Sequence, residues 1–439
     1  MVEDKIKQYG VFLTPVDIFE KYIFDNIKNY LNDFVFVDFF CGTGNLILPI
    51  LNHIDADKRV DYFKNHIFMF DILQEQVDIA IKNAKIYGIP ENLAKENIKV
   101  KDSISDYPTD LINKYGDRLF HITNPPYLST RVIGRSRFKL ELKRFKGDYS
   151  KFTDIYQLAL YNDIIHGLKN MIYIIPSNFI FATTSVKNIR HAIFEKYNIS
   201  NAVMFEKRIF DYTGTNVGIF EFVRNNKMDY KKTFTAKKIY YNGEKTIKYE
   251  LLKKYDYAGG TKFYEFLEKM PKSKNYKIFF KLKEKELNDN RGNNNVVIYY
   301  TNTKELKNVG VNENEFNKIK NNILYARIVD GGRKDTRIGL YDIRKFHNEK
   351  CDGIASLTKF HRVGPIEVFI NPQISLKEQE QLINRFNYHL EKLRHETDSD
   401  FLLTFQVPFG NGYIKKYMPI KLFSTLILIC LNEIEKHDK

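Results

Sequence analysis

The tetrapeptide Asn124-Pro125-Pro126-Tyr127 combines residue types that suit a planar ring bearing an exocyclic amino group. Its two prolines remove backbone N–H donors, so the carbonyl groups of the segment are available as acceptors. Asn124 adds a side-chain carbonyl acceptor, and Tyr127 adds an aromatic face. Two acceptors could take the N–H bonds of the amino group while the aromatic face stacks on the ring. The tetrapeptide alone is equally compatible with a turn that ends a strand.

The elements that must position this tetrapeptide are short apolar runs, each followed by a polar residue. Carboxyl ends of parallel strands lie at one edge of a doubly wound sheet, so we expect these polar groups on one rim. The sequence therefore predicts an α/β fold with a Rossmann-like sheet and helices on both faces. The pairs of run and polar residue are 34–37 with Asp38, 66–70 with Asp71, 97–100 with Asp102, and 119–123 with Asn124.

A glycine-rich turn, residues 41–45, follows the first of these runs. Glycine allows a ligand to approach the backbone, and we expect a helix over residues 46–51 whose N-terminus offers free N–H groups. A carboxylate of a bound amino acid or a phosphate would suit that place. Asp38 would accept from an ammonium group. The turn is not a Walker loop, and Ile47 occupies the position of the third glycine of a dinucleotide fingerprint.

The two later carboxylates, Asp71 and Asp102, indicate that the site binds a nucleoside. Asp71 stands where a Rossmann-like domain holds ribose hydroxyls, although a helix-capping role is the alternative. Asp102 would lie at the same sheet edge, where it could accept from an adenine amino group.

A run of basic residues with interleaved aromatics follows the tetrapeptide. It is either a solvated charged surface or a segment that clamps a phosphate backbone or closes over a bound base. Its members are Arg131, Arg135, Arg137, Phe138, Lys139, Lys143, Arg144, Phe145 and Lys146.

The charge of the 439-residue chain is uneven. Residues 1–226 hold 29 basic and 27 acidic side chains, whereas residues 227–439 hold 40 and 27. We expect two domains with this boundary, the second a mixed α+β domain that includes a helix with a Ser375/Glu378 capping box. A basic domain indicates a polyanionic partner such as nucleic acid, although a Lys- and Asn-rich proteome is an alternative source of the charge.

The three cysteines, Cys41, Cys351 and Cys430, show no metal-ligand spacing and fit a reducing compartment, so we expect no metal. Residues 1–5 lack the apolar core of a signal peptide, and the apolar run 422–431 is too short for a membrane span. The sequence predicts a soluble cytoplasmic protein without membrane contact.

Taken together, residues 8–224 resemble the DNA adenine-N6 methyltransferases of type II restriction–modification systems, in the γ order of motifs. The resemblance implies a methyltransferase domain over residues 1–226 and a DNA target-recognition domain over residues 227–439. It further implies S-adenosyl-L-methionine as cofactor, double-stranded DNA as substrate, a separately encoded restriction endonuclease, and action as a monomer.

The resemblance also assigns residues. The implied catalytic set is Asn124, Pro125, Pro126, Tyr127 and Phe210, with Tyr212 as an alternative to Phe210. The implied cofactor set is Tyr9, Thr14, Pro15, Asp38, Phe40, Gly42, Gly44, Asn45, Asp71, Ile72, Asp102, Ser103 and Asn124. The DNA-binding candidates are Arg131, Arg135, Arg137, Arg291, Arg333, Lys334, Arg337, Lys415 and Lys416. In the implied mechanism, adenine is flipped out of the duplex, and Asn124 and the Pro125 carbonyl accept its N6–H bonds.

Two other classes of substrate remain open. Methyltransferases acting on RNA bases and on protein glutamine also use this tetrapeptide, because these substrates present a planar amino or amide group. A non-catalytic DNA-binding module would give no reason for Asp71, Asp102 and the tetrapeptide to line up. A fused endonuclease would require an acidic-x-Lys nuclease pattern, and the sequence shows no convincing one.

Overall fold

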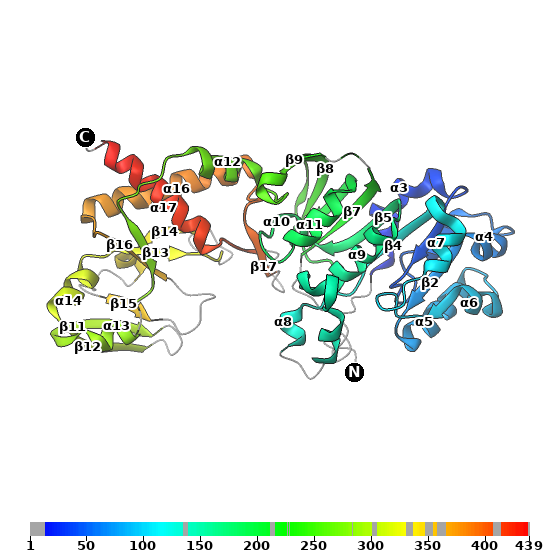
Figure 1. Ribbon diagram of the computed structural model, residues 1–439, viewed down its shortest axis with the longest axis horizontal. Coiled ribbons are helices and arrows are strands. Elements are labelled where there is room, and N and C mark those ends of the chain that lie inside the picture. The colour runs from blue at the N-terminus through cyan, green and yellow to red at the C-terminus, as the bar shows by residue number, and fades with distance from the viewer. Residues whose placement is uncertain are drawn as a thin grey trace. The chain divides into compact units, whose positions relative to one another are not determined.

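The computed structural model describes residues 14–134, 139–210, 216–225, 227, 229–282, 284–300, 305–330, 337–346, 354–357, 366–406 and 414–437. The chain forms two compact units. Unit 1 comprises Met1–Gly259 and Val407–Gly412, and unit 2 comprises Gly260–Gln406 and Tyr413–Lys439. Figure 1 shows the elements of both units.

Unit 1 is built on one large sheet. Among the described residues it has nine strands in the order β3-β2-β1-β4-β5-β7-β6-β8-β9. The first five positions are mutually parallel, and β7 is antiparallel to both of its neighbours. The strands are β1 Val35–Asp38, β2 Ile67–Asp71, β3 Ile98–Val100, β4 Leu119–Thr123, β5 Asn170–Pro176, β6 Tyr197–Phe205, β7 Val217–Arg224, β8 Lys231–Tyr240 and β9 Gly243–Leu252.

Helices and turns connect these strands. The α-helices are α2 Val16–Tyr22, α3 Phe24–Ile27, α4 Arg59–His66, α5 Gln74–Ile86, α6 Glu91–Asn97, α7 Thr109–Tyr115, α8 Thr130–Ile133, α9 Ile155–His166, α10 Asn178–Phe181 and α11 Lys187–Phe194. The 3₁₀ helices are η1 Lys28–Tyr30, η2 Leu48–His53, η3 Gly116–Arg118, η4 Lys139–Arg144, η5 Gly147–Lys151 and η6 Lys253–Tyr255.

The apolar periods of the sequence account for these elements. All five residues of β4 are buried, as a strand covered on both faces requires. Helix α5 buries Val77, Ala80, Ile81 and Ala84, which share one face at helical spacing. The helix ends before Gly88, whose φ of +85° places it in the left-handed region that favours glycine. The predicted α/β fold with a mostly parallel sheet is therefore confirmed.

The sheet continues past the boundary expected at residue 226. Strands β8 and β9 pair along their whole length, and β8 pairs in parallel with β6, so the first segment of unit 1 extends to Gly259. The sheet of unit 1 therefore includes residues 231–252. Four of the residues of β8 are lysines, so its alternation of buried and exposed residues is not evident as an alternation of apolar and polar residues in the sequence. Two of these are buried with partners: Lys232 donates to Asn198 Oδ1 at 2.8 Å, and the Lys238 ammonium lies 3.6 Å from the Glu206 carboxylate.

The helix expected over residues 46–51 also differs. The chain forms a turn at Leu46 and Ile47 and then the 3₁₀ helix η2. Pro49 lies at the start of η2 and has no N–H to donate, and no α-helix follows the glycine turn directly. The N-terminus of a regular α-helix is therefore not available to a ligand at this turn.

Unit 2 is a mixed α+β unit with smaller sheets. Its described strands form sheets of the order β10-β16-β13-β14, β12-β11-β15 and β17-β18. The strands are β10 Lys277–Phe280, β11 Arg291–Tyr300, β12 Glu305–Val311, β13 Leu324–Arg327, β14 Gly339–Asp342, β15 Ile354–Leu357, β16 Ile366–Asn371, β17 Leu403–Gln406 and β18 Lys415–Tyr417. The helices are α12 Thr261–Lys269, α13 Glu284–Asp289, α14 Glu313–Lys320, α15 Ile343–Phe346, α16 Leu376–Thr397 and α17 Ile420–His437.

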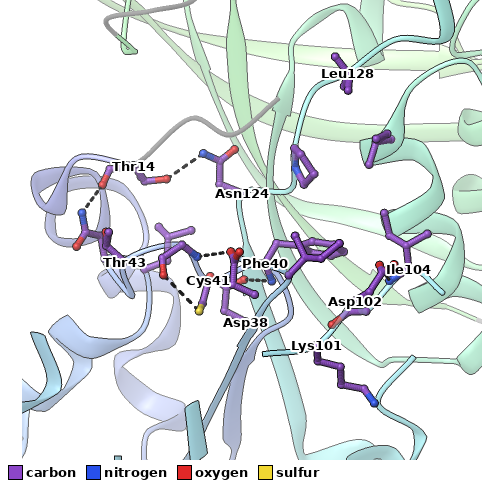
Figure 2. Close-up of a pocket in the computed structure, with 18 of the residues that line it drawn as sticks. Thr14, Asp38, Phe40, Cys41, Thr43, Lys101, Asp102, Ile104, Asn124 and Leu128 are labelled. Atoms are coloured by element: carbon purple, nitrogen blue, oxygen red, sulfur yellow. Dashed lines mark hydrogen bonds between the residues drawn. The ribbon is translucent and has the colours of Figure 1, made fainter. Parts of the chain in front are cut away.

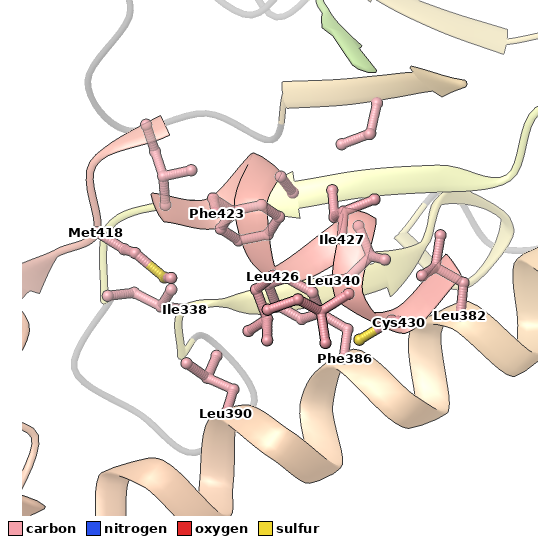
Figure 3. Packing of buried hydrophobic residues seen from close by; sticks show 14 of the residues in the cluster. Ile338, Leu340, Leu382, Phe386, Leu390, Met418, Phe423, Leu426, Ile427 and Cys430 are labelled. Atoms are coloured by element: carbon pink, nitrogen blue, oxygen red, sulfur yellow. The ribbon is translucent and has the colours of Figure 1, made fainter. Parts of the chain in front are cut away.

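The core of unit 2 lies between its two long helices and a sheet. Leu382, Phe386 and Leu390 of α16 face Phe423 and Leu426 of α17 (Figure 3). The capping box predicted at the start of α16 is present, because Ser375 accepts from the Glu378 amide and Glu378 accepts from the Ser375 amide. No helix in the part of the chain that the structure describes is long and apolar enough to cross a lipid bilayer.

Candidate functional site

One cavity in unit 1 lies at the carboxyl ends of β1, β2, β3 and β4 (Figure 2). Thr14 and Thr43 lie on one side of it, and Asp102 and Ile104 lie on the other. Its wall consists of Thr14, Asp38, Phe40, Cys41, Gly42, Thr43, Asn45, Leu46, Asp71, Ile72, Lys101, Asp102, Ser103, Ile104, Asn124, Pro126, Leu128, Arg144 and Ile155.

The Asp38 carboxyl group, at the end of β1, lies at the base of this cavity and is 1 % exposed. Its Oδ1 accepts from the Thr123 hydroxyl at 2.6 Å and from the Phe40 amide at 2.9 Å. Burial raises the pKa of Asp38 to about 6, although these hydrogen bonds oppose the shift. At neutral pH Asp38 is therefore a fixed anion that suits a cationic ligand group.

A buried polar network lies beside Asp38. The Phe39 amide donates to His121 Nε2 at 3.1 Å, and His121 Nδ1 donates to Asp163 Oδ2 at 2.6 Å. Because Nε2 accepts, the imidazole is neutral with its proton on Nδ1. The hydroxyls of Tyr107 and Tyr173 also donate to Asp163, at 2.7 and 2.6 Å. The network fixes the backbone just after Asp38 against β4, the strand that delivers Asn124.

The glycine turn and Asp71 form the next part of the wall. Gly42 and Gly44 have φ of +52° and +84°, a conformation that favours glycine. A Cβ on Gly44 would lie 2.7 Å from Leu48 Cδ1. Asp71 Oδ2 accepts from the Gly42 amide and Oδ1 accepts from the Leu73 amide, both at 2.9 Å. Burial raises the pKa of Asp71, and the two amide bonds oppose that shift.

Asp102 and Ser103 form the far end of the cavity. Both oxygens of Asp102 accept from Arg144 Nη1, at 3.0 and 2.7 Å. Ser103 is 2 % exposed, and its hydroxyl has no hydrogen-bond partner among the described residues. A buried hydroxyl without a partner costs free energy, so a polar ligand atom would be favourable beside it.

Asn124 stands at the near end of the cavity, held from two sides. Its Nδ2 donates to the Thr14 hydroxyl at 3.0 Å, and its Oδ1 accepts from the Tyr127 hydroxyl. The same Tyr127 hydroxyl approaches the Ile174 carbonyl at 2.7 Å. Thr14 in turn accepts from the Asn45 side chain through its own carbonyl at 2.8 Å. The amide plane of Asn124 is thereby fixed by residues from three separate parts of the chain.

The aromatic candidates are more buried than a stacking role suggests. The Tyr127 ring is 9 % exposed and lies edge-on to Tyr156, at 6.3 Å between centroids. Phe210 is 4 % exposed, and its carbonyl accepts from Arg208 Nε at 2.8 Å. Neither ring lines the cavity. Tyr212, the alternative to Phe210, lies outside the described residues.

The structure thus brings together most residues of the predicted cofactor set. The members in the cavity wall are Thr14, Asp38, Phe40, Gly42, Asn45, Asp71, Ile72, Asp102, Ser103 and Asn124, together with Pro126 of the predicted catalytic set. Pro15, Gly44 and Pro125 are not in the wall, and Tyr9 lies outside the described residues.

Sequence reasoning missed several residues of the wall. Lys101 and Ile104 flank Asp102 and could have been found by extending that motif. Leu128, Arg144 and Ile155 come from the segment after the tetrapeptide. The sequence offered closure of this segment over a bound base as one of two interpretations, but it did not single out these three residues. Cys41, Thr43 and Leu46 belong to the glycine turn and were not named for the site.

The DNA-binding candidates are spread over both units. Arg131 is exposed on α8. Arg291 donates to Asn288 Oδ1 at 2.7 Å, and Arg337 pairs with Glu391 at 3.1 Å. Lys415 and Lys416 are half-buried on β18. Arg135, Arg137, Arg333 and Lys334 lie outside the described residues.

Fold and site together define a class of protein. A sheet edge with three carboxylates and a glycine turn can hold a nucleoside ligand with a cationic group, and an Asn-Pro-Pro-Tyr corner opens onto the same cavity. The chain belongs to the N-6 DNA methylase family, whose model matches residues 1–308. The family predicted from the sequence is thereby confirmed, whereas the type II system and the γ order stay predictions.

Comparison with solved structures gives distant likenesses. The chain is similar to the DrdV protein of a DNA complex, with 12 % identity, a TM-score of 0.41, and coverage of 58 % of this chain and 31 % of that one. It is similar to the M protein of the type I restriction enzyme EcoKI, with 14 % identity, a TM-score of 0.38, and coverage of 54 % of this chain and 50 % of that one. It is also similar to the methyltransferase subunit of a type I restriction–modification system from Streptococcus thermophilus. Here the identity is 20 %, the TM-score is 0.34, and the match covers 51 % of this chain and 47 % of that one.

The chain thus covers half or less of the length of each of these proteins. No curated protein sequence matches the chain.

Proposed function

We propose that this protein transfers a methyl group from S-adenosyl-L-methionine to N6 of an adenine flipped out of duplex DNA. One observation carries the proposal: Asn124 and Pro126 of the tetrapeptide and the strand-end carboxylates Asp38, Asp71 and Asp102 line one cavity. A methyl donor bound along the strand ends would then lie next to the acceptors that hold an amino group. Membership of the N-6 DNA methylase family supports adenine as the target.

The cavity wall fits the cofactor chemically. Asp38 would accept from the ammonium group, Asp71 from the ribose hydroxyls, and Asp102 from the adenine amino group. The Ser103 hydroxyl, which lacks a partner among the described residues, offers a further bond to a polar atom of the ligand. When bound, S-adenosyl-L-methionine supplies the methyl group as an electrophile.

The protein's part in the reaction is to position an amine that is normally a poor nucleophile. Asn124 Oδ1 and the Pro125 carbonyl accept the two N6–H bonds, which favours a pyramidal nitrogen with its lone pair free. The Tyr127 hydroxyl donates to the same Asn124 oxygen and so keeps it oriented. Catalysis therefore comes from positioning and preorganised acceptors, without a strong general base.

The biological setting follows from the resemblance. We infer a type II restriction–modification system in which methylation protects DNA from a separately encoded endonuclease, with the enzyme acting as a cytoplasmic monomer. Unit 2 would read the target sequence in duplex DNA.

The test is methyl transfer from labelled S-adenosyl-L-methionine to unmethylated plasmid DNA, RNA and release-factor protein in parallel. We expect label in DNA alone. Label in RNA or in protein glutamine, with none in DNA, would overturn the proposal and assign the same cavity to another planar amino or amide group.

A further inference from the structure

The basic segment after the tetrapeptide contributes one side chain to the cavity. Arg144 Nη1 donates to both oxygens of Asp102 and to Ser105 Oγ, the last at 3.0 Å. The side chains of Arg144 and Asp102 are 16 % and 28 % exposed, so water only partly screens the pair. The neighbouring Lys143 is exposed and does not line the cavity.

Arg144 is held there by its own surroundings. Leu142 and Phe145, on either side of it, pack against a cluster of the buried residues Leu128, Ile133 and Ile155. Ile104, from the loop after Asp102, packs on the same cluster.

The segment is also fixed at its base. The Thr130 amide donates to the Thr153 carbonyl at 2.9 Å, and the Leu128 amide donates to Asp154 Oδ1 at 2.9 Å. The position of Arg144 therefore follows from packing and backbone bonds and does not depend on the ion pair alone.

The pair changes what Asp102 can offer a ligand. A lone carboxylate near the surface rotates and is solvated, and both its oxygens serve only as acceptors. Arg144 fixes the plane of the carboxylate, which lines the cavity. Lone pairs that Arg144 and the Ile104 amide do not use remain for a ligand. A ligand amino group can donate to these, whereas a carbonyl oxygen at the same position would be repelled.

We propose that Arg144 is a specificity-determining residue of the cofactor site, which holds the Asp102 carboxylate in place to select an adenine over a 6-oxopurine. This inference deepens the proposed function and rests on it. It divides the basic segment, because Arg144 serves the cofactor while the exposed cations of the segment stay available to DNA.

The test compares equilibrium dissociation constants, by calorimetry, for S-adenosylhomocysteine and S-inosylhomocysteine, which differ at position 6 of the purine. Arg144→Ala is expected to weaken binding of the adenine ligand about tenfold, as loss of a partly screened charged hydrogen bond would. Binding of the inosine ligand should stay within about twofold, so discrimination falls. Lys143→Ala, the matched control, should leave both constants unchanged.

A second comparison asks whether Arg144 acts through Asp102. The double variant Arg144→Ala/Asp102→Asn should bind the adenine ligand no worse than Asp102→Asn alone, because the effects are coupled. Unchanged discrimination in Arg144→Ala, an equal loss for both ligands, or additive effects in the double variant would each overturn the proposal. Wild-type protein that fails to bind S-adenosylhomocysteine would instead overturn the proposed function.

Discussion

The two units use polar side chains in different ways. In unit 1, Asp38, Asp71, Asp102 and Asn124 come from four strand ends and converge on one cavity. In unit 2, the described DNA-binding candidates are dispersed, and Arg337 forms an ion pair within the unit. Chemistry on one atom needs fixed geometry, whereas affinity for a phosphate backbone needs mainly charge. Variants in unit 1 should therefore change turnover or cofactor binding, and variants in unit 2 should change DNA affinity or unit stability.

The largest effect is expected at Asn124. Asn124→Ala removes an acceptor that is placed for the amino group in the transition state, so kcat should fall about 100- to 1,000-fold. Affinity for S-adenosylhomocysteine should stay within about twofold, since the carboxylates that we propose to hold it are unchanged. Single-turnover methylation and calorimetry measure the two quantities. A kcat near the wild-type value would remove Asn124 from the mechanism.

A variant in the core of unit 2 tests whether the two units unfold independently. Phe386 is fully buried in α16, and its ring centroid lies 4.4 Å from that of Phe423. Phe386→Ala should destabilise unit 2 by about 3–5 kcal/mol. In differential scanning calorimetry, the transition of unit 2 should move to lower temperature, while unit 1 still binds S-adenosylhomocysteine.

Tyr388 on the same helix provides the control for Phe386. It is 67 % exposed, so Tyr388→Ala should leave both transitions in place. Loss of cofactor binding in Phe386→Ala would show that unit 1 depends on the core of unit 2. That result would contradict separate effects of variants in the two units.

Tyr127→Phe separates two roles of one ring. The variant keeps the aromatic face and removes only the hydroxyl that orients Asn124 Oδ1. We expect kcat to fall about tenfold, the effect of one hydrogen bond of about 1.4 kcal/mol, with cofactor affinity unchanged. Turnover equal to that of the wild type would show that the Tyr127 hydroxyl is not needed to orient Asn124.

The pKa of Asp38 predicts how cofactor binding depends on pH. Burial raises this pKa to about 6, so the carboxyl group is protonated at lower pH and no longer accepts from an ammonium group. The dissociation constant for S-adenosylhomocysteine should be level from about pH 7 to 8 and should rise up to about tenfold per pH unit below 6. Asp38→Asn should bind more weakly and remove this dependence on pH.

The raised pKa of Asp38 also makes the free energy of unfolding depend on pH. The folded-state pKa of Asp38 lies above its ordinary value of 3.8, so the native state binds more protons between these values than the unfolded state does. The contribution of Asp38 to the free energy of unfolding is thus largest below the ordinary value and falls as pH rises through about 6. The measurement is the midpoint of denaturant unfolding as a function of pH. If this midpoint depends on pH in the same way in Asp38→Asn as in the wild type, the assignment of the effect to Asp38 is contradicted.

The smallest effects are expected on the surface of unit 2. Lys415→Gln and Lys416→Gln should weaken DNA binding and make the slope of log K against log salt less negative by about 0.9 per lost phosphate contact. At saturating DNA, kcat should not change. Lys436→Gln, which removes an exposed charge of α17, is the control. A lower kcat at saturating DNA would place the two lysines in the catalytic step.

Much of unit 1 could be predicted because its information is local. Each parallel strand is an apolar run that ends at a polar residue, so Asp38, Asp71 and Asn124 could be placed at one rim from the sequence. Their partners could not. Thr14 and Asn124 are 110 residues apart, and Asp102 and Arg144 are 42 apart, and no local pattern joins either pair.

The strand β8 was missed for a related reason. Its lysines are typical of a solvated surface, and only the fold supplies Asn198 and Glu206 as partners that allow Lys232 and Lys238 to be buried. In unit 2, one capping box and its apolar stripe predicted α16, but the short strands carry no comparable signal. Charge composition indicated a polyanionic partner for the second half of the chain without locating a binding surface.

The most direct test of the central claim is the identity of the methylated nucleoside. Plasmid DNA lacking methylation would be treated with wild-type enzyme and S-adenosyl-L-methionine, digested to nucleosides, and analysed by mass spectrometry. We predict N6-methyldeoxyadenosine, formed by the wild type and formed about 100- to 1,000-fold more slowly by Asn124→Ala. N4-methyldeoxycytidine in its place, or N6-methyldeoxyadenosine at the same rate from Asn124→Ala, would contradict the account of an adenine amino group held at Asn124.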